Sequence, residues 1–232
     1  MTAPRCSSRW SDIFHSLLQT LFPVWCVGCG ARLQGREQWL CSACQAGLRY
    51  NDKVMPGNEE TGWAAAGAVF MYGPAVRQLI HMLKYDDATR VARYLGHHAV
   101  RYMHEVWPHA MPDVVVPVPL HPTRQRERGY NQSLLLARAI ASGLPARLEP
   151  TLVQRGRYTS SQTHLNREQR LQNVRDAFVR GAVDLTGRTV LVVDDVFTTG
   201  STATAVARAL LADGDARYGA AKQVFVLTIA RA

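Results

Sequence analysis

The sequence has no apolar run long enough to cross a membrane. Residues 63–71 are largely apolar, but a membrane-spanning helix needs about 20 such residues. The first residues lack the long apolar stretch and small-residue cleavage site of a secretory signal peptide, and no internal repeat is present. With 47% hydrophobic residues, the chain has enough apolar side chains for an ordinary core. We therefore expect a folded cytoplasmic protein without a transmembrane segment.

Lysine is scarce, although the chain is basic. The 232 residues contain 3 Lys and 24 Arg, and the net charge is +9. Eleven Arg and four acidic residues lie between His121 and Arg180, so this window alone has an excess of +7. Arginine binds phosphate through two N–H groups at once, which indicates pyrophosphate, nucleic acid or both as ligands. A general preference for arginine over lysine is the alternative explanation, but by itself it does not account for the clustering.

The chain has only five cysteines, and four of them follow a C-x2-C-x11-C-x2-C spacing. Each CxxC pair forms a tight turn that directs two thiolates at one ion, and two such turns complete a tetrahedral site. In a cytoplasmic protein this pattern favours metal over disulfides; unliganded thiols and redox-active pairs are the alternatives. We expect one structural zinc without an open coordination position, bound by Cys26, Cys29, Cys41 and Cys44. Cys6 lies outside the pattern.

The clearest functional pattern is VLVVDDVFTTGST, from Val190 to Thr202. Its first four residues are apolar and mostly β-branched, which predicts a buried strand over 190–193. Two carboxylates, Asp194 and Asp195, follow the predicted strand. A hydroxyl-rich turn then leads into a helix predicted over 203–211, and this turn contains Thr198, Thr199, Gly200, Ser201 and Thr202.

Each part of this pattern suits one part of a ribose 5-phosphate. The N-terminus of a helix carries N–H groups without intrahelical partners, so a phosphate fits there. Paired carboxylates accept hydrogen bonds from sugar hydroxyls or help to hold a hydrated Mg²⁺. A buried strand followed by a capped helix would explain the apolar run, but not two adjacent acids followed by TTGST. The absence of Gly-Lys-Ser/Thr excludes a P-loop.

Further strands and helices alternate along the chain. Strands are predicted over 65–72, 113–118, 177–179 and 224–229, and helices over 13–22, 75–85, 89–106, 131–142 and 166–174. Alternation of this kind predicts an α/β fold with an open, mostly parallel sheet and flanking helices. We expect a helical segment over 1–24, a zinc-ribbon-like module over 25–50, a polar linker over 51–63 and the main domain over 64–232.

A basic loop is predicted after the strand at 113–118. It contains Arg124, Arg126, Arg128, Gly129 and Tyr130. Ligands of open α/β sheets bind at the carboxyl ends of the strands, so this loop and the Asp pair are expected to face one ligand, with the loop at a pyrophosphate. A solvated arginine loop is the alternative. The polar segment that begins at residue 159 suits a mobile hood over the site.

The order of these motifs resembles one known family. All thirteen positions of VLVVDDVFTTGST match the phosphoribosyl pyrophosphate (PRPP) motif of type I phosphoribosyltransferases. The wider order, CxxC…CxxC, PVPLHP…RGYNQ, Gln-x7-Arg-x2-Asn-Val and VDDVFTTGST, resembles the ComF/GntX family. The resemblance implies a type I phosphoribosyltransferase-like domain over 64–232 with an N-terminal zinc module.

The resemblance also implies roles for single residues. Asp194 and Asp195 are expected to hold the ribose hydroxyls and Mg²⁺, Thr198 to Thr202 the 5-phosphate, and Arg124 to Tyr130 the pyrophosphate. A hood is expected from the segment that contains Gln162, Arg170 and Asn173.

Two functions follow from the resemblance. One is a PRPP-binding protein of DNA uptake, natural competence or DNA utilisation that binds single-stranded DNA and meets a DNA-uptake helicase or recombination proteins. The alternative is an active phosphoribosyltransferase that transfers phosphoribosyl from PRPP to a base or other nucleophile. The sequence has no obvious base-recognition signature, which weakens the second. It has few aromatic residues among its arginines beyond Tyr130 and Tyr158, which limits base stacking in the first.

Overall fold

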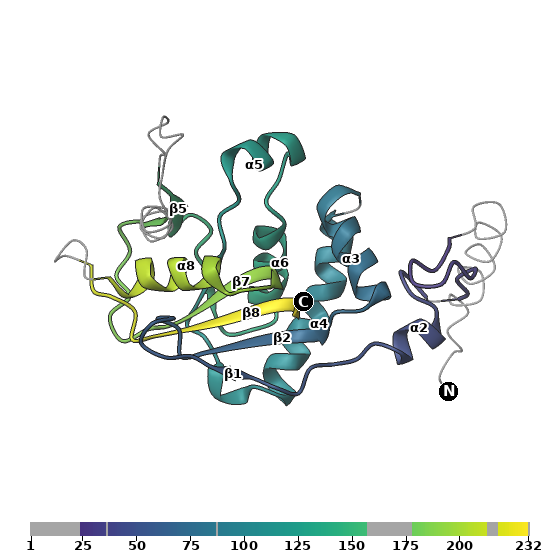
Figure 1. Ribbon diagram of the computed structural model, residues 1–232, viewed down its shortest axis with the longest axis horizontal. Coiled ribbons are helices and arrows are strands. Elements are labelled where there is room, and N and C mark those ends of the chain that lie inside the picture. The colour runs from purple at the N-terminus through teal and green to yellow at the C-terminus, as the bar shows by residue number, and fades with distance from the viewer. Residues whose placement is uncertain (1–23, 36, 87, 157–177, 213–217, 232) are drawn as a thin grey trace, which may run out of the picture.

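A mostly parallel sheet forms the centre of the fold (Figure 1). The computed structural model describes residues 24–35, 37–86, 88–156, 178–212 and 218–231. The sheet has six strands in the order β1-β2-β8-β7-β3-β4. In that order the strands are Met55–Pro56, Ala65–Met71, Gln223–Arg231, Thr189–Phe197, Val114–Pro117 and Arg147–Leu148. Only β1 runs antiparallel to its neighbour, and the predicted open, mostly parallel α/β sheet is confirmed.

The central pair β7 and β8 follows from its sequence. Both strands are rich in valine and other branched residues, and Val190 to Val193 are fully buried. Such continuous apolar runs are typical of parallel strands with both faces covered. The strand β7 is longer than the sequence predicts, since it continues through Asp194 and Asp195 to Phe197. The two carboxylates therefore lie within the strand rather than after it.

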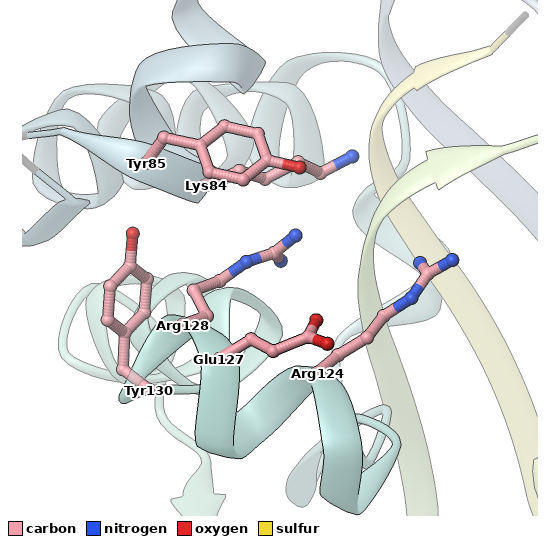
Figure 2. A pocket seen from close by; sticks show the side chains of 6 residues that line it. All are labelled: Lys84, Tyr85, Arg124, Glu127, Arg128 and Tyr130. Carbon is pink, nitrogen blue, oxygen red and sulfur yellow. The ribbon is translucent and has the colours of Figure 1, made fainter.

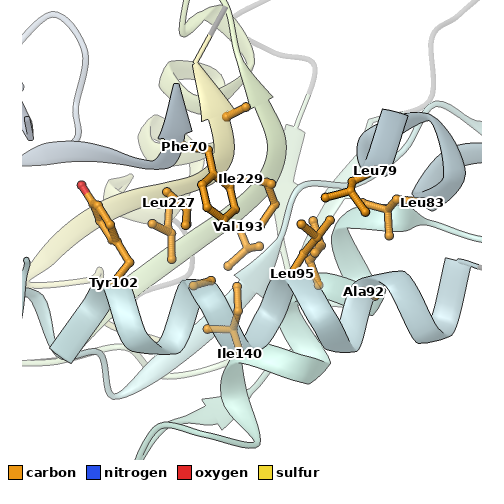
Figure 3. Close-up of a cluster of buried hydrophobic side chains, with 14 of the residues drawn as sticks. Phe70, Leu79, Leu83, Ala92, Leu95, Tyr102, Ile140, Val193, Leu227 and Ile229 are labelled. Atoms are coloured by element: carbon orange, nitrogen blue, oxygen red, sulfur yellow. The ribbon is translucent and has the colours of Figure 1, made fainter. Parts of the chain in front are cut away.

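Helices cover both faces of the sheet. On one face lie α3 (Pro74–Tyr85), α4 (Ala88–Glu105) and α6 (Gln132–Ala141), which form one core with Leu191, Val193 and residues of β2 and β8 (Figure 3). On the other face α8 (Ser201–Leu211) packs with Val190 and Val192. Alternate residues of β7 thus enter different cores, as the period of two in a strand requires. A 3-10 turn, η1 (Pro108–Ala110), follows α4.

A small second sheet adjoins α8. It pairs β5 (Val153–Arg155) with β6 (Phe178–Arg180) in antiparallel fashion. The sequence predicts β6 within one residue but not β5. The predicted helices over 13–22 and 166–174, and the hood residues Gln162, Arg170 and Asn173, lie outside the described residues.

The four-cysteine module packs against the sheet domain. Figure 1 shows it at one end of the molecule, beside α3 and away from α8. It contains the bridge between Trp25 and Arg32 and the short helix α2 (Ser42–Ala46). Leu33 and Leu40 belong to the same core as α3 and α4, and the Arg90 guanidinium lies 5.5 Å from the Trp39 ring centre. The module therefore shares its core with the helices of the sheet domain.

The polar segment expected as a linker also joins this structure. Residues 55–56 form β1, which pairs with β2, and the Asn51 N–H donates to the Val69 carbonyl at 3.0 Å. No helix in the described part of the chain is long and apolar enough to cross a membrane.

Candidate functional site

The carboxyl end of the sheet brings the main motifs together. Strands β3 and β7 are parallel neighbours, with Pro117 opposite Val193. The basic segment that follows β3 and the acidic residues near the end of β7 therefore meet at one edge, as the sequence predicts. Parallel α/β sheets bind ligands at this edge.

The two adjacent carboxylates point to different neighbours. Asp195 lies on the α3 face, where Lys84 Nζ approaches its Oδ2 to 2.6 Å. Asp194 lines a small pocket on the α8 side, and its Oδ1 accepts a hydrogen bond from Ser133 Oγ at 2.8 Å. The two acids thus have different polar partners, although their carboxyl groups remain close enough to influence each other.

The environment of Asp194 disfavours its charge. Burial and the neighbouring Asp195 carboxylate raise the pKa of Asp194 to about 7, although the hydrogen bonds from Ser133 and the Asp195 N–H act in the opposite direction. Carboxyl groups with raised pKa values are frequent at functional sites, where burial and nearby like charges shift them.

The contact between Lys84 and Asp195 spans distant parts of the sequence. Lys84 lies in the last turn of α3, and the side chains of Lys84 and Asp195 are 27% and 10% exposed. The Asp195 Oδ1 atom accepts from the Val196 N–H at 2.9 Å, so both oxygens of this carboxylate have a donor nearby. Lys84 and Ser133 lie in no recognisable local motif, so the sequence predicts no role for either residue.

The hydroxyl-rich turn lines the small pocket beside Asp194. Gly200 has a φ of +75°, a conformation that strongly favours glycine, and a Cβ there would lie 2.8 Å from the Phe197 ring. As the N-cap of α8, Gly200 has no side chain to accept from the first-turn N–H groups. Thr199 Oγ and Ser201 Oγ lie 3.0 Å apart. The pocket residues are Asp194, Val196, Phe197, Thr198, Gly200, Ser201, Thr202, Ala203, Val226 and Thr228.

A second, larger pocket lies between α3 and the basic segment. It has a volume of about 350 Å³ and is lined by Lys84, Tyr85, Arg124, Glu127, Arg128 and Tyr130 (Figure 2). The basic segment is a helix, α5 (Pro122–Arg128), and not the loop that the sequence predicts. Pro122 at its first turn and Gly129 at its C-cap, with a φ of +79°, are strong start and stop signals.

Helix α5 separates its arginines. Arg124 and Arg128 are four residues apart, share one face and line the pocket. Arg126, two residues from each, is exposed and is not among the lining residues. The sequence predicts one pyrophosphate-binding set that contains all three arginines, whereas only Arg124 and Arg128 line the pocket.

Contacts within the pocket hold its walls together. The Arg128 guanidinium lies 5.1 Å from the centre of the Tyr85 ring and donates to Gln132 Oε1 at 2.6 Å. The Tyr130 hydroxyl donates to the Leu83 carbonyl at 3.1 Å, which ties the end of α5 to α3. Tyr85 thus adds an exposed aromatic ring to the basic pocket, and sequence spacing gave no sign of it.

The four cysteines converge as the spacing predicts. The sulfur atoms of Cys26, Cys29, Cys41 and Cys44 all lie within 4.8 Å of one another. A tetrahedral zinc with bonds of about 2.3 Å requires sulfur atoms about 3.8 Å apart, so the cluster fits one ion. The Cys41 N–H donates to Cys26 Sγ at 3.3 Å, and Gly30 has a φ of +72° in the first turn.

The thiols influence one another strongly. Burial opposes ionisation of Cys26, but backbone N–H groups of Cys41, Cys29 and Gly28 lower its pKa to about 6. Hydrogen bonding with the Cys29 and Cys26 side chains raises the pKa of Cys44 to about 12. The cluster therefore favours a thiolate at Cys26 and a thiol at Cys44, and a divalent cation is the group that would stabilise several thiolates together.

Comparisons with known proteins agree with this geometry. A family model described as phosphoribosyl transferase domain matches residues 131–231. The chain is 34% identical over 168 residues to the DNA utilization protein YhgH of Escherichia coli K12, which covers 71% of this chain and 72% of the relative. The chain belongs to the ComF/GntX family of phosphoribosyltransferase-like proteins.

Other relatives extend the match along the chain. The DNA utilization protein YhgH of Salmonella typhimurium is 29% identical over 213 residues, covering 84% of this chain and 93% of the relative. Competence protein F of Haemophilus influenzae is 28% identical over 214 residues, covering 83% of this chain and 93% of the relative. The phosphoribosyl transferase match begins at Asn131, so Lys84 and α5 lie outside it. In this ComF/GntX protein, the basic pocket is therefore built largely by residues that precede the matched domain.

Proposed function

We propose that this ComF/GntX protein binds PRPP, or a closely related phosphorylated ribose, and acts in DNA uptake or DNA utilisation. The observation that carries the proposal is the meeting of two pockets at one edge of the sheet. The pocket of the TTGST turn contains Asp194, and the basic pocket contains Lys84, whose ammonium group contacts Asp195. PRPP has the matching order of groups: a 5-phosphate, a diol and a diphosphate.

The TTGST turn suits the 5-phosphate. The first N–H groups of α8 point out of the helix N-terminus, where the helix dipole favours an anion. The hydroxyls of Thr199 and Ser201 lie 3.0 Å apart in the same turn and add further donors. Asp194 and Asp195, three and two positions before the end of β7, then accept from the ribose hydroxyls.

The basic pocket suits the diphosphate. Three cationic side chains line it, Lys84, Arg124 and Arg128, against the single carboxylate of Glu127 among the described lining residues. A guanidinium binds two phosphate oxygens at once, and its charge offsets that of the diphosphate. The Tyr130 hydroxyl is occupied by the Leu83 carbonyl, so we assign Tyr130 to the pocket wall.

Magnesium would accompany PRPP at this edge. The Asp195 carboxylate already contacts Lys84, and Asp194 accepts from Ser133, so neither acid offers an open pair of oxygens. Mg²⁺ retains waters and prefers substrate phosphates with one or two carboxylates. It would therefore sit mainly on ligand oxygens and waters, and would supply charge neutralisation to the diphosphate.

The DNA part of the proposal rests on the names of the relatives and on charge. Proteins named for DNA utilisation and competence match most of this chain. Arg126 on the outer face of α5 and the basic window around it provide phosphate contacts, and single-stranded DNA binds such surfaces with strong salt dependence. A DNA-uptake helicase or recombination proteins are the partners that this role implies.

An active phosphoribosyltransferase is the second candidate, and the match of residues 131–231 to a phosphoribosyl transferase domain favours it. In that case a base or other nucleophile would bond to C1 of the ribose while pyrophosphate leaves, with its charge stabilised by Arg124 and Arg128. Measurement of pyrophosphate release across a panel of bases separates the two functions. A binding protein would release no pyrophosphate above background with any base, whereas an enzyme would release pyrophosphate with one acceptor.

Calorimetry tests PRPP binding itself. The wild-type protein is titrated with PRPP, ribose 5-phosphate and inorganic pyrophosphate, each with and without Mg²⁺. We expect PRPP to bind most tightly, because it alone engages both pockets, and Mg²⁺ to strengthen its binding. Undetectable binding of PRPP at millimolar concentration would show that the motif serves as a scaffold in this protein.

A further inference from the structure

Lys84 is the side chain that joins the two pockets. Its ammonium nitrogen lies 2.6 Å from Asp195 Oδ2, and the same side chain lines the basic pocket with Arg124 and Arg128. Figure 2 shows Lys84 and Tyr85 extending from α3 on one side of the pocket, with the residues of α5 opposite. One flexible cation is therefore in reach of both the carboxylate and the basic pocket.

The pair is costly to break unless something replaces it. Asp195 is 7% exposed, so its carboxylate is largely removed from water. A buried charge without a partner is strongly unfavourable, and the Lys84 ammonium compensates it in the free protein. Sugar hydroxyls that donate to Asp195 would take over part of this compensation. The lysine, with a long stem and three donors, is then able to turn to another anion.

We propose that Lys84 is a specificity-determining residue that neutralises Asp195 in the free protein and donates to the diphosphate when PRPP binds. This inference rests on the proposed binding of PRPP. The position of Lys84 between the diol-binding carboxylate and the two pocket arginines carries it. The charge of the basic pocket is then greatest when the ribose hydroxyls occupy Asp195, so the two halves of the ligand bind cooperatively.

The consequence is a preference for ribose with a diphosphate over ribose without one. Ribose 5-phosphate has the 5-phosphate and the diol but no diphosphate. Loss of Lys84 removes a charged donor from the PRPP complex only. A hydrogen bond to a charged group corresponds to about a ten- to hundredfold change in affinity, and the ratio of the two affinities should fall by that factor.

The test compares both ligands on Lys84→Met by calorimetry in the presence of Mg²⁺. We expect PRPP affinity to fall about tenfold or more and ribose 5-phosphate affinity to stay the same or rise, since Asp195 loses its competing cation. The matched control is Lys222→Met. Lys222 is exposed and lines neither pocket, so this substitution should change neither affinity. Lys84→Arg keeps the charge and should retain most of the preference.

A purely structural lysine predicts a different result. If Lys84 only supports the fold, Lys84→Met weakens both ligands equally and the ratio is unchanged, which overturns the inference. The double variant Lys84→Met, Asp195→Asn leaves no unpaired buried charge. If Lys84→Met alone folds poorly, the ratio of PRPP affinity to ribose 5-phosphate affinity is measured on this double variant. The double variant is compared with Asp195→Asn alone. If the two proteins have the same ratio of affinities, the inference is also overturned. Failure of wild-type protein to bind PRPP would instead refute the proposed function on which the inference rests.

Discussion

The Tyr50 hydroxyl lies 2.6 Å from Nδ1 of His98, and this contact joins the chain that leaves the four-cysteine module to helix α4. His98 is 7% exposed and is surrounded by the rings of Tyr50, Phe70 and Tyr94, at centre distances between 4.7 and 5.9 Å. Desolvation, followed by the charges of His97 and Arg101, lowers the pKa of His98 to about 4. The neutral imidazole and the Tyr50 hydroxyl share one hydrogen bond, and the tautomer of His98 sets which of the two groups donates.

This contact predicts a loss of stability in mild acid. Between about pH 6.5 and pH 4 the unfolded chain binds a proton at His98 and the folded chain does not, so the free energy of unfolding falls as pH falls. The limiting size is roughly 3 kcal/mol for this pKa difference. Asp194, with its raised pKa, contributes in the opposite direction between pH 7 and pH 3.8.

Comparison with His98→Asn isolates the histidine, because asparagine places a neutral amide, able to donate or accept a hydrogen bond, near the position of Nδ1. Urea unfolding at several pH values should show the wild type approaching or falling below the variant as pH decreases. His104→Asn replaces an exposed histidine of α4 that does not contribute to the lowered pKa, so it is the control and should follow the wild type. A constant difference between wild type and His98→Asn from pH 8 to pH 4 would contradict the lowered pKa.

The four-cysteine cluster predicts one zinc per chain. Metal analysis of purified protein should give about one equivalent, and Cys41→Ser should lose the metal. Because the module shares its core with α3 and α4, the variant should also lower the unfolding temperature of the whole protein. Cys6→Ser, outside the paired spacing, should keep the metal. A well-folded, metal-free wild type would refute the assignment.

The Asp pair and the turn predict separable effects on ligand binding. Asp195→Asn keeps the shape but removes the charge, and PRPP affinity should fall about ten- to hundredfold. Thr199→Val removes a hydroxyl 3.0 Å from Ser201 and should weaken PRPP and ribose 5-phosphate by the same factor. Calorimetry measures both. Unchanged PRPP affinity in Asp195→Asn would exclude the acid from the site.

The two faces of α5 predict different ligands. Arg124→Gln and Arg128→Gln should weaken PRPP, since both side chains line the basic pocket, whereas Arg126→Gln should leave PRPP binding unchanged. All three should weaken single-stranded DNA, and each lost phosphate contact should reduce the slope of log affinity against log salt by about 0.7. Fluorescence anisotropy at several salt concentrations measures this slope. Affinity for DNA that does not depend on salt would contradict the electrostatic account.

The sequence by itself determined those features that depend on neighbours along the chain. The apolar run before Asp194 specified β7, the apolar spacing in 75–85 and 89–106 specified α3 and α4, and the CxxC spacing specified the cysteine cluster. Each of these features depends on the spacing of apolar residues within one element or on the geometry of one tight turn. The parallel sheet then followed from the alternation of strands and helices, which leaves few other connections.

The tertiary structure alone decided which distant side chains meet. Lys84 reaches Asp195 because α3 packs on one face of β7, and Ser133 reaches Asp194 because α6 begins beside the same strand end. The different partners of the two acids also depend on the extent of β7, since the sequence predicted both acids beyond the strand. Such contacts depend on packing between elements that are far apart in the chain, so no local sequence pattern predicts them.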